Sequence, residues 1–316
     1  MIIRAPAVIK VGNTVIYTEE NIVEKTEIST VEGKNAIQGK YDEFDDNVIH
    51  TITFKPAAQA TSPYFNLLYP AAYRNPVMGA SIYGDNPDDI IIWTKSGEQH
   101  TYKAGALTGM PDLGFGAIMS IFDGEATLIA LGSATEGRDT EGHFATFAAV
   151  AFNDVSFDQT KDIRAPYTVS WGAAPFDSIV TEAGVKVKHD LQLGDEVTDA
   201  KGIIGKYITG LVVTASFTPQ GITAEQILTA MGVQGEGARR GRSRGSLGRD
   251  LIITTGIEGE PYYKLFNCVL KGSTSQFGVT ANNLGEISLQ SVLKITNGAS
   301  TPIFEIGLTP APEPEA

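Results

Sequence analysis

Apolar and polar residues alternate most regularly in the stretch 211–217, where every second residue is apolar and these residues share one side of the strand. The stretch 48–54 alternates in the same way, with His50 on its apolar side. This period of two predicts a half-buried antiparallel strand at each place. Further apolar runs predict strands at 7–17, 90–94, 116–122, 125–131, 144–152, 251–255, 262–270 and 285–295.

A short helix is predicted after each of the two alternating strands. After the second strand, Thr223 and Gln226 have the spacing of a capping box, and the apolar stripe that follows ends at Gly232. After the first strand, Ser62 precedes Pro63, which predicts an N-cap followed by the proline that first helical positions favour.

Short sequence matches connect the two halves of the chain. Ile3-Arg4-Ala5-Pro6 returns at 163–166, and the stretch 124–128 returns in part at 285–289. These matches have nearly constant offsets, 163 − 3 = 160 and 285 − 124 = 161, which chance does not readily produce. Further matches join Gly39-Lys40-Tyr41 with Gly205-Lys206-Tyr207, Phe54 with Phe217, 89–92 with 250–253, and Tyr102-Lys103 with Tyr263-Lys264.

The repeat predicts both the domain organisation and the fold class. We expect a mainly β protein of two tandem homologous β-barrel or β-sandwich modules, each with one short flanking α-helix. The first module with a connecting stretch spans 1–160, the second spans 161–308, and 309–316 form a disordered tail rich in proline and glutamate. Repeated modules are typical of rings and tubes, whereas an enzyme needs one asymmetric site.

Composition narrows the classes of protein. The 316 residues are 42 % hydrophobic and 19 % charged, as in soluble globular proteins. The net charge of −13 argues against a broad basic face that wraps nucleic acid. No apolar run approaches the ~20 residues that cross a bilayer, and Met1-Ile2-Ile3-Arg4 does not resemble a secretion signal. We therefore expect assembly in the cytoplasm and no membrane partner.

The residues that could carry chemistry favour neither an enzyme nor a metal site. Cys268 lies in an apolar stretch and is expected to be a small buried hydrophobe. Gly241–Gly245 matches the written form of a nucleophile elbow around Ser243, but its flanks are not the required strand and helix. The acidic stretch 42–46 is expected to be a solvated turn. We expect no catalytic residue, no cofactor and no metal, because the histidines lack ligand spacing: His50, His100, His143 and His189.

Long loops are predicted at 69–88 and 233–249, and loops of this length are usually functional or disordered. The second loop is basic on an otherwise acidic chain. Two interpretations remain open, a solvated flexible loop or a contact between stacked copies of the protein. The residues of this predicted inter-ring contact are Arg239, Arg240, Arg242, Arg244 and Arg249.

A family resemblance rests on the second half of the chain. The glycine-rich start at 202, the alternating strand ending in Phe217-Thr218-Pro219 and the helix at 223–228 resemble the tail tube (major tail) proteins of long-tailed bacteriophages. Gly285-Glu286-Ile287-Ser288-Leu289 is similar to a closing strand of that family. The chain departs from the usual single module by its duplication and by the added stretch 132–162.

The resemblance implies a structural virion protein rather than an enzyme. Six modules would form each ring, so that three two-module chains make a homotrimer that imitates a hexamer. Rings would stack head to tail into a hollow conduit through which DNA passes during genome ejection without specific binding. The implied partners are other copies of the chain and the tail initiator, tape-measure and terminator proteins, and the implied location is the virion tail after assembly in the host cytoplasm.

The alternating strands also predict a channel wall. Small hydroxyl side chains on their non-core faces suit a surface past which DNA slides. The predicted lumen-facing residues are Thr51, Thr53, Thr214 and Ser216.

A duplicated β-sandwich that binds carbohydrate or decorates a virion is the alternative. Aromatic side chains could supply stacking platforms for sugars. The candidates are Tyr64, Tyr69, Tyr73, Trp93, Trp171, Tyr262 and Tyr263.

Overall fold

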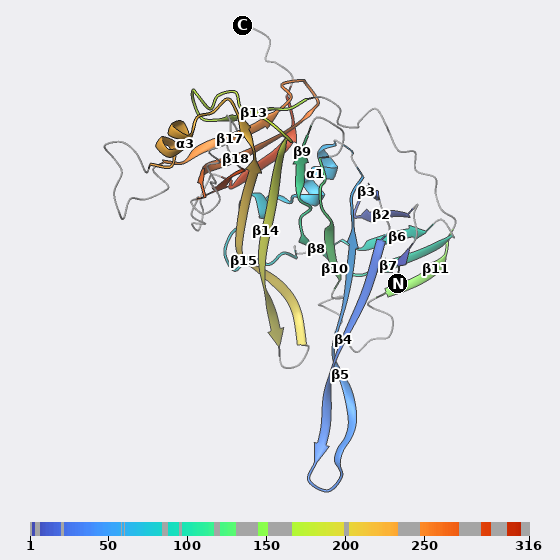
Figure 1. The fold of residues 1–316 in the computed structure, drawn as a ribbon. Coiled ribbons are helices and arrows are strands. Elements are labelled where there is room, and N and C mark those ends of the chain that lie inside the picture. Colours follow the sequence, from blue (N-terminus) through green and yellow to red (C-terminus); the bar gives the residue numbers. More distant parts are fainter. Residues whose placement is uncertain are drawn as a thin grey trace.

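The protein is mainly β, with three short helices in the part of the chain that the structure describes (Figure 1). The computed structural model describes residues 2–3, 7–19, 22–57, 59, 61–83, 88–94, 97–116, 121–130, 145–150, 166–198, 202–232, 247–271, 286–291 and 302–310.

Two five-stranded antiparallel sheets are built from the first half of the chain. Their apolar side chains alternate inward, and Ile9, Ile52 and Ile92 are fully buried. A hydrogen bond between Glu24 on one sheet and His100 on the other shows that the two sheets face each other. In spatial order the first sheet contains β1 (Ile2–Ile3), β4 (Ile22–Asn35), β5 (Gly39–Phe54), β10 (Ala126–Ala130) and β8 (Gly105–Gly109). The second contains β11 (Ala145–Ala149), β7 (Glu98–Tyr102), β6 (Ile90–Thr94), β2 (Ala7–Val11) and β3 (Thr14–Tyr17).

An eight-stranded antiparallel sheet carries the second half and takes one strand from the first half. In spatial order it contains β12 (Thr168–Trp171), β17 (Arg249–Thr254), β18 (Pro261–Leu270), β19 (Ile287–Ser291), β15 (Gly202–Phe217), β14 (Val185–Thr198) and β9 (Leu113–Phe115), with β20 (Phe304–Leu308) paired to β18. A small ribbon pairs β13 (Val180–Thr181) with β16 (Pro219–Gln220).

The helices are α1 (Ser62–Leu68), α2 (Ala71–Arg74) and α3 (Ala224–Ala230). The predicted capping box of α3 is confirmed, since Thr223 and Gln226 exchange both hydrogen bonds. The prediction for α1 was off by one residue, because Thr61 rather than Ser62 is the N-cap. The sequence did not predict α2, which lies inside the first long loop.

Most predicted strands are found, with two corrections. The predicted strand at 7–17 is a hairpin, because Gly12 turns the chain at a φ of +57°. In the described part of the predicted strand at 116–122, Phe122 forms only an isolated bridge with Leu113. The two alternating strands are found and are much longer than predicted, and each pairs with a 14-residue strand, β4 or β14, that the predicted strands did not include.

The two long hairpins, β4–β5 and β14–β15, have the same length, register and irregularities. Val23 lies opposite Thr53, and Lys186 lies opposite Ser216, so both strands are related by one offset, 186 − 23 = 163 and 216 − 53 = 163. Both hairpins leave the body of the molecule in the same direction (Figure 1). The bulges follow the same offset and lie at Ser29/Thr30 and Gly33/Lys34 in the first hairpin and at Gln192/Leu193 and Glu196/Val197 in the second.

The strands beside the hairpins also pair equivalently in the two halves. Phe54 lies opposite Ala126 in the first half, as Phe217 lies opposite Ile287 in the second. The same equivalence relates the pair Ile9 and Ile92 to the pair Val169 and Ile253.

Two of the sequence matches do not correspond in the structure. The hairpin register makes Gly39 equivalent to Gly202 at the tip rather than to Gly205. Tyr102 is equivalent to Leu265 rather than to Tyr263. The reason is that the second half has two extra residues before β18. Ile90 lies opposite Tyr102 and Leu251 lies opposite Leu265, so the offset is 251 − 90 = 161 on one strand and 265 − 102 = 163 on the other.

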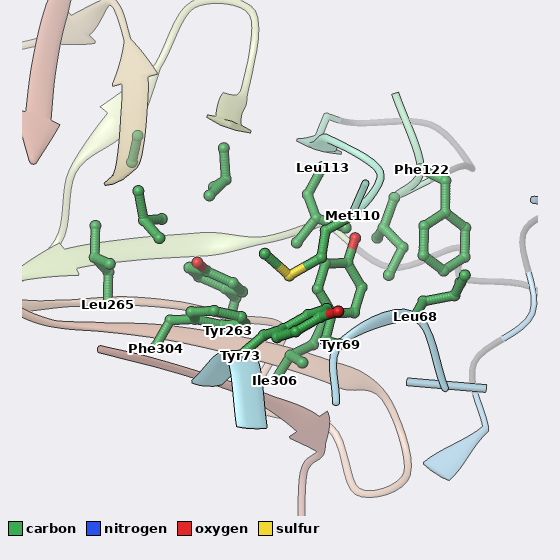
Figure 2. Close-up of a cluster of buried hydrophobic side chains, with 14 of the residues drawn as sticks. Leu68, Tyr69, Tyr73, Met110, Leu113, Phe122, Tyr263, Leu265, Phe304 and Ile306 are labelled. Atoms are coloured by element: carbon green, nitrogen blue, oxygen red, sulfur yellow. The ribbon is translucent and has the colours of Figure 1, made fainter. Parts of the chain in front are cut away.

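One hydrophobic core extends across both halves. Figure 2 shows Tyr69 and Tyr73 from the first half lying against Tyr263 and Phe304 from the second. The rings of Tyr263 and Phe304 stack at 5.7 Å, and the ring of Tyr69 meets Phe304 edge-on at 6.1 Å. The halves therefore pack as one body.

Candidate assembly surface

The outer part of the β4–β5 hairpin is the most exposed apolar feature of the described chain. Five large apolar side chains there are more than half exposed. Burial of exposed apolar surface is favourable by about 25 cal/mol per Å², which makes this hairpin a candidate interface. The five residues are Ile28, Val31, Ile37, Tyr41 and Phe44.

Local sequence explains why this hairpin holds its shape outside the core. The rings of Tyr41 and Phe44 lie against Gly33, where an added Cβ would meet either ring at 2.8 Å. At the tip, the side chain of Asn35 accepts hydrogen bonds from the amides of Ile37 and Gln38. The aromatic faces therefore cover the backbone of β4 but leave their other sides exposed.

The equivalent hairpin of the second half is covered by the first half. β9 pairs along β14, with Phe115 opposite Val185 and Leu113 opposite Val187. On the other strand, the segment 79–82 pairs with β15 around Tyr207. The two hairpins thus share one backbone design, including a strand paired at the base, β9 on β14 and β1 on β4. Among the described residues, only the outer part of the second hairpin has a further segment along its edge.

The predicted lumen-facing residues lie on the outer faces of their sheets. Thr51 and Thr53 are half-buried, whereas the residues between and beside them are buried in the core. In the second half, Thr214 and Ser216 alternate in the same way. The hydroxyl of Ser216 lies 2.8 Å from that of Ser288 on β19. These four hydroxyls line two equivalent strands, and their exposure to a channel stays a prediction.

The structure describes one of the five arginines of the predicted contact. Arg239, Arg240, Arg242 and Arg244 lie outside the described residues, as does Ser243. Arg249 begins β17, and its guanidinium lies 5.4 Å from the ring centre of Trp171 and 5.7 Å from that of Phe176. Such stacking fixes the side chain by cation–π attraction within its own chain.

Sequence reasoning missed a buried polar cluster between the two first-half sheets. Glu24 on β4 accepts a hydrogen bond of 2.7 Å from the hydroxyl of Tyr102, and its other oxygen lies 2.9 Å from Nδ1 of His100. His50 lies 2.9 Å from the hydroxyl of Thr26 and packs against the ring of Tyr102. Burial lowers the pKa of His50 and raises that of Tyr102.

This cluster could not be found from spacing, since its members come from three separate strands. The one available signal is Glu24 itself, a charged residue at a position whose second-half equivalent is Val187. Buried carboxylates are retained only when paired. Glu24 is paired with His100 and Tyr102, and these hydrogen bonds join the two sheets.

His189 occupies a second buried polar position, at the junction of the two halves. Its Nε2 lies 3.0 Å from the hydroxyl of Tyr263, and its ring packs against Tyr69 and Phe304. Burial lowers its pKa to about 3. The ring therefore packs as a neutral aromatic at physiological pH.

Cys268 is a buried hydrophobe, as predicted. Its thiol donates to the carbonyl oxygen of Arg249 at 3.0 Å. Burial raises its pKa to about 12, which leaves it without the thiolate that nucleophilic chemistry needs.

Within the described part of the chain, no three histidine, cysteine, aspartate or glutamate side chains gather where they could hold a metal ion. The described helices are all too short or too polar to cross a membrane.

Five of the seven aromatic residues proposed as sugar platforms are in the core: Tyr64, Tyr69, Tyr73, Trp171 and Tyr263. Only Trp93 and Tyr262 of that set are partly exposed. Buried rings cannot stack on a ligand, so these residues do not support the carbohydrate-binding alternative.

No protein-family model matches the chain, and no curated protein matches it.

Proposed function

We propose that the protein is a structural, non-catalytic subunit of a self-assembling tube of the bacteriophage tail-tube type. Its two halves would act as tandem homologous modules, and three chains would close a ring with sixfold-like symmetry. Stacked rings would form a conduit through which DNA passes. The tail initiator, tape-measure and terminator proteins are the partners proposed with it, and the virion tail is the proposed location.

One observation carries the proposal. Two hairpins of the same length, register and bulges occur in one chain, and the segment 79–82 lies along the outer part of the second, whereas the outer part of the first presents exposed apolar side chains. If another chain covers the first hairpin as 79–82 covers the second, the contact joins different surfaces of the two chains. Such heterologous, head-to-tail contacts close into rings when the rotation permits.

Charge and surface chemistry support the conduit. The net charge of −13 would repel DNA, and the small neutral hydroxyls on the outer faces of β5 and β15 supply no cation that would retain it. A wall of this kind allows passage without specific binding.

Electron microscopy and light scattering of the purified full chain test the proposal. We expect rings or hollow cylinders with three chains per ring, and a mass in multiples of three chains. A protein that stays monomeric at all concentrations, or that forms only twofold dimers, would overturn it.

A further inference from the structure

We infer that the arginine-rich segment 233–246 of one copy adds to the outer edge of β5, at 43–45, in a second copy. The inference rests on the proposed function, because it names the contact that closes the ring. It differs from the stacking contact expected from sequence, since it places the arginines within a ring rather than between rings.

The template is a contact inside the chain. The segment 79–82, which lies between α2 and β6, runs along the free edge of β15. The amide of Gly79 donates to the carbonyl of Ile208 at 2.8 Å, and the amide of Ile208 donates to the carbonyl of Ala80 at 2.9 Å. The amide of Ile82 donates to the carbonyl of Lys206 at 3.0 Å. The first half thus extends the second-half hairpin by one strand-like segment.

The first half has an equivalent strand edge, which the offset of 163 between the two hairpins identifies. Residues 206–208 of β15 correspond to 43–45 of β5, since 206 − 163 = 43 and 208 − 163 = 45. Within the described residues, 43–45 pair only with β4, and β10 reaches β5 no further than His50. An open strand edge is a ready acceptor for backbone hydrogen bonds from another chain.

Apolar side chains of the first hairpin are more exposed than their equivalents in the second. Ile28 is 57 % exposed, whereas its equivalent Leu191 is partly buried against the core. Phe44 is 51 % exposed, and its equivalent Tyr207 is 36 % exposed beside the segment 79–82. The described part of the chain thus leaves the outer first hairpin more exposed than the second, which has the segment 79–82 beside it.

The same repeat identifies the covering segment. Strand β6 begins at Ile90 and its equivalent in β17 is Leu251, an offset of 161. The segment 79–82 then corresponds to 240–243, which lies outside the described residues, and Ser81 corresponds to Arg242.

Charge makes this pairing specific. The hairpin stretch 27–46 contains six acidic and two basic residues, for a net charge of −4. The segment 233–246 contains four arginines and one glutamate, for a net charge of +3. The two lysines of the hairpin already pair within it, Lys34 with Glu32 and Lys40 with Glu32 and Glu43, while Asp42 stays exposed. Opposite charges of this size select the correct partner and speed its association.

A cysteine pair in separate copies tests the contact directly. One protein carries Phe44→Cys and a second carries Arg242→Cys, and the two are mixed before mild oxidation. We expect a disulfide-linked pair of chains that contains one of each protein. Opposed residues of an antiparallel pair lie about 4.5–5.5 Å apart, within disulfide range.

The matched reference is the contact already present in the chain. Ser81→Cys with Tyr207→Cys should form a link inside one chain, because these residues form an antiparallel bridge. The control for random collision is Glu258→Cys in place of Arg242→Cys, since Glu258 is an exposed turn residue outside the segment. Linking of Phe44→Cys to Glu258→Cys as efficiently as to Arg242→Cys would overturn the inference.

Charge reversal gives an independent readout. Asp42→Lys with Glu43→Lys should raise the concentration needed for ring formation by about tenfold or more, and Arg240→Glu with Arg242→Glu should restore assembly in the combined variant. Replacement of Asp195 and Glu196 on the second hairpin by lysine should raise the concentration needed for ring formation less than the Asp42 and Glu43 replacements do. If rings form normally, but Phe44→Cys and Arg242→Cys do not link and the charge reversals have no effect, this contact is wrong while the proposed tube still stands. A chain that never assembles would overturn both the contact and the tube.

Discussion

Ala104 and Asn267 adopt the same left-handed backbone conformation, with φ of 53° and 45°. Each lies two residues after an equivalent paired residue, Tyr102 in the first half and Leu265 in the second. In the first half this position lies between β7 and β8, and in the second it lies within β18, directly before the residues that pair with β19. A residue such as alanine is strained by about 1–2 kcal/mol in this region, whereas asparagine tolerates it better, so the strain is larger at Ala104.

Replacement of Ala104 by glycine should therefore stabilise the protein. Glycine removes the steric strain but adds unfolded-state entropy, so we expect a gain of up to about 1 kcal/mol in the free energy of unfolding. Urea denaturation measures it. The control is Ala106→Gly, at an ordinary backbone conformation on β8, which should lose about 0.5–1 kcal/mol. Equal effects of the two glycines would contradict the assignment of strain.

The two hairpins should respond differently to a charge at one equivalent position. Ile28→Lys should leave the thermal midpoint nearly unchanged and abolish assembly, because Ile28 is exposed in the single chain. Leu191→Lys should instead lower the free energy of unfolding by about 2 kcal/mol or more, because Leu191 packs against the core. Calorimetry and light scattering on both variants separate the effects, and normal assembly of Ile28→Lys would count against the exposed hairpin as an interface.

The buried Glu24 should be essential for stability. Glu24→Ala leaves the hydroxyl of Tyr102 and the ring of His100 without their carboxylate, which should lower the free energy of unfolding by about 2–4 kcal/mol. Tyr102→Phe removes one hydrogen bond and should lower it by about 1–2 kcal/mol. Glu27→Ala is the control, because Glu27 is exposed and pairs only with Lys25 at the surface, where we expect less than about 0.5 kcal/mol.

Acid should destabilise the protein partly through His189. Burial lowers its folded pKa to about 3, below the unfolded value of about 6.5. Because the folded pKa is depressed, the unfolded chain takes up the proton first. The stabilising effect of the neutral ring is therefore complete above about pH 6.5 and is lost as the pH falls toward 3.

The variant His189→Leu isolates this contribution. Between about pH 6 and pH 4, its free energy of unfolding should depend on pH less steeply than that of the natural chain, by about 1.4 kcal/mol per pH unit. His50→Val, which introduces the residue found at the equivalent position Val213, should change the slope less, since His50 is less deeply buried. Parallel slopes for the natural chain and His189→Leu would show that the histidine is not shielded as described.

Cys268 should react with thiol reagents only when the protein unfolds. Its pKa of about 12 and its burial under Arg249 leave almost no accessible thiolate at neutral pH. Labelling followed across a urea titration should coincide with loss of β structure by circular dichroism. Rapid stoichiometric labelling in native buffer would contradict this and would require Cys268→Ala in the crosslinking proteins.

The sequence alone determined the features that depend on local pattern. Alternation predicted the inner parts of β5 and β15, because a half-buried strand must place apolar side chains on one side. Thr223 and Gln226 predicted the start of α3, because a capping box satisfies backbone amides within one turn. The matches between halves likewise indicated a repeat whose strand registers the structure shows to be equivalent at most positions.

Tertiary structure alone decided the rest. The outer parts of the hairpins carry apolar and charged residues without a clean alternation, because neither face meets the core there. The inner part of β14, 185–193, does alternate and could have been predicted from the sequence. Partners for Glu24 come from distant strands, which one-dimensional spacing does not reveal. Nor could the sequence show that the segment 79–82 lies along the outer part of the second hairpin, because that contact depends on how the two halves pack in space.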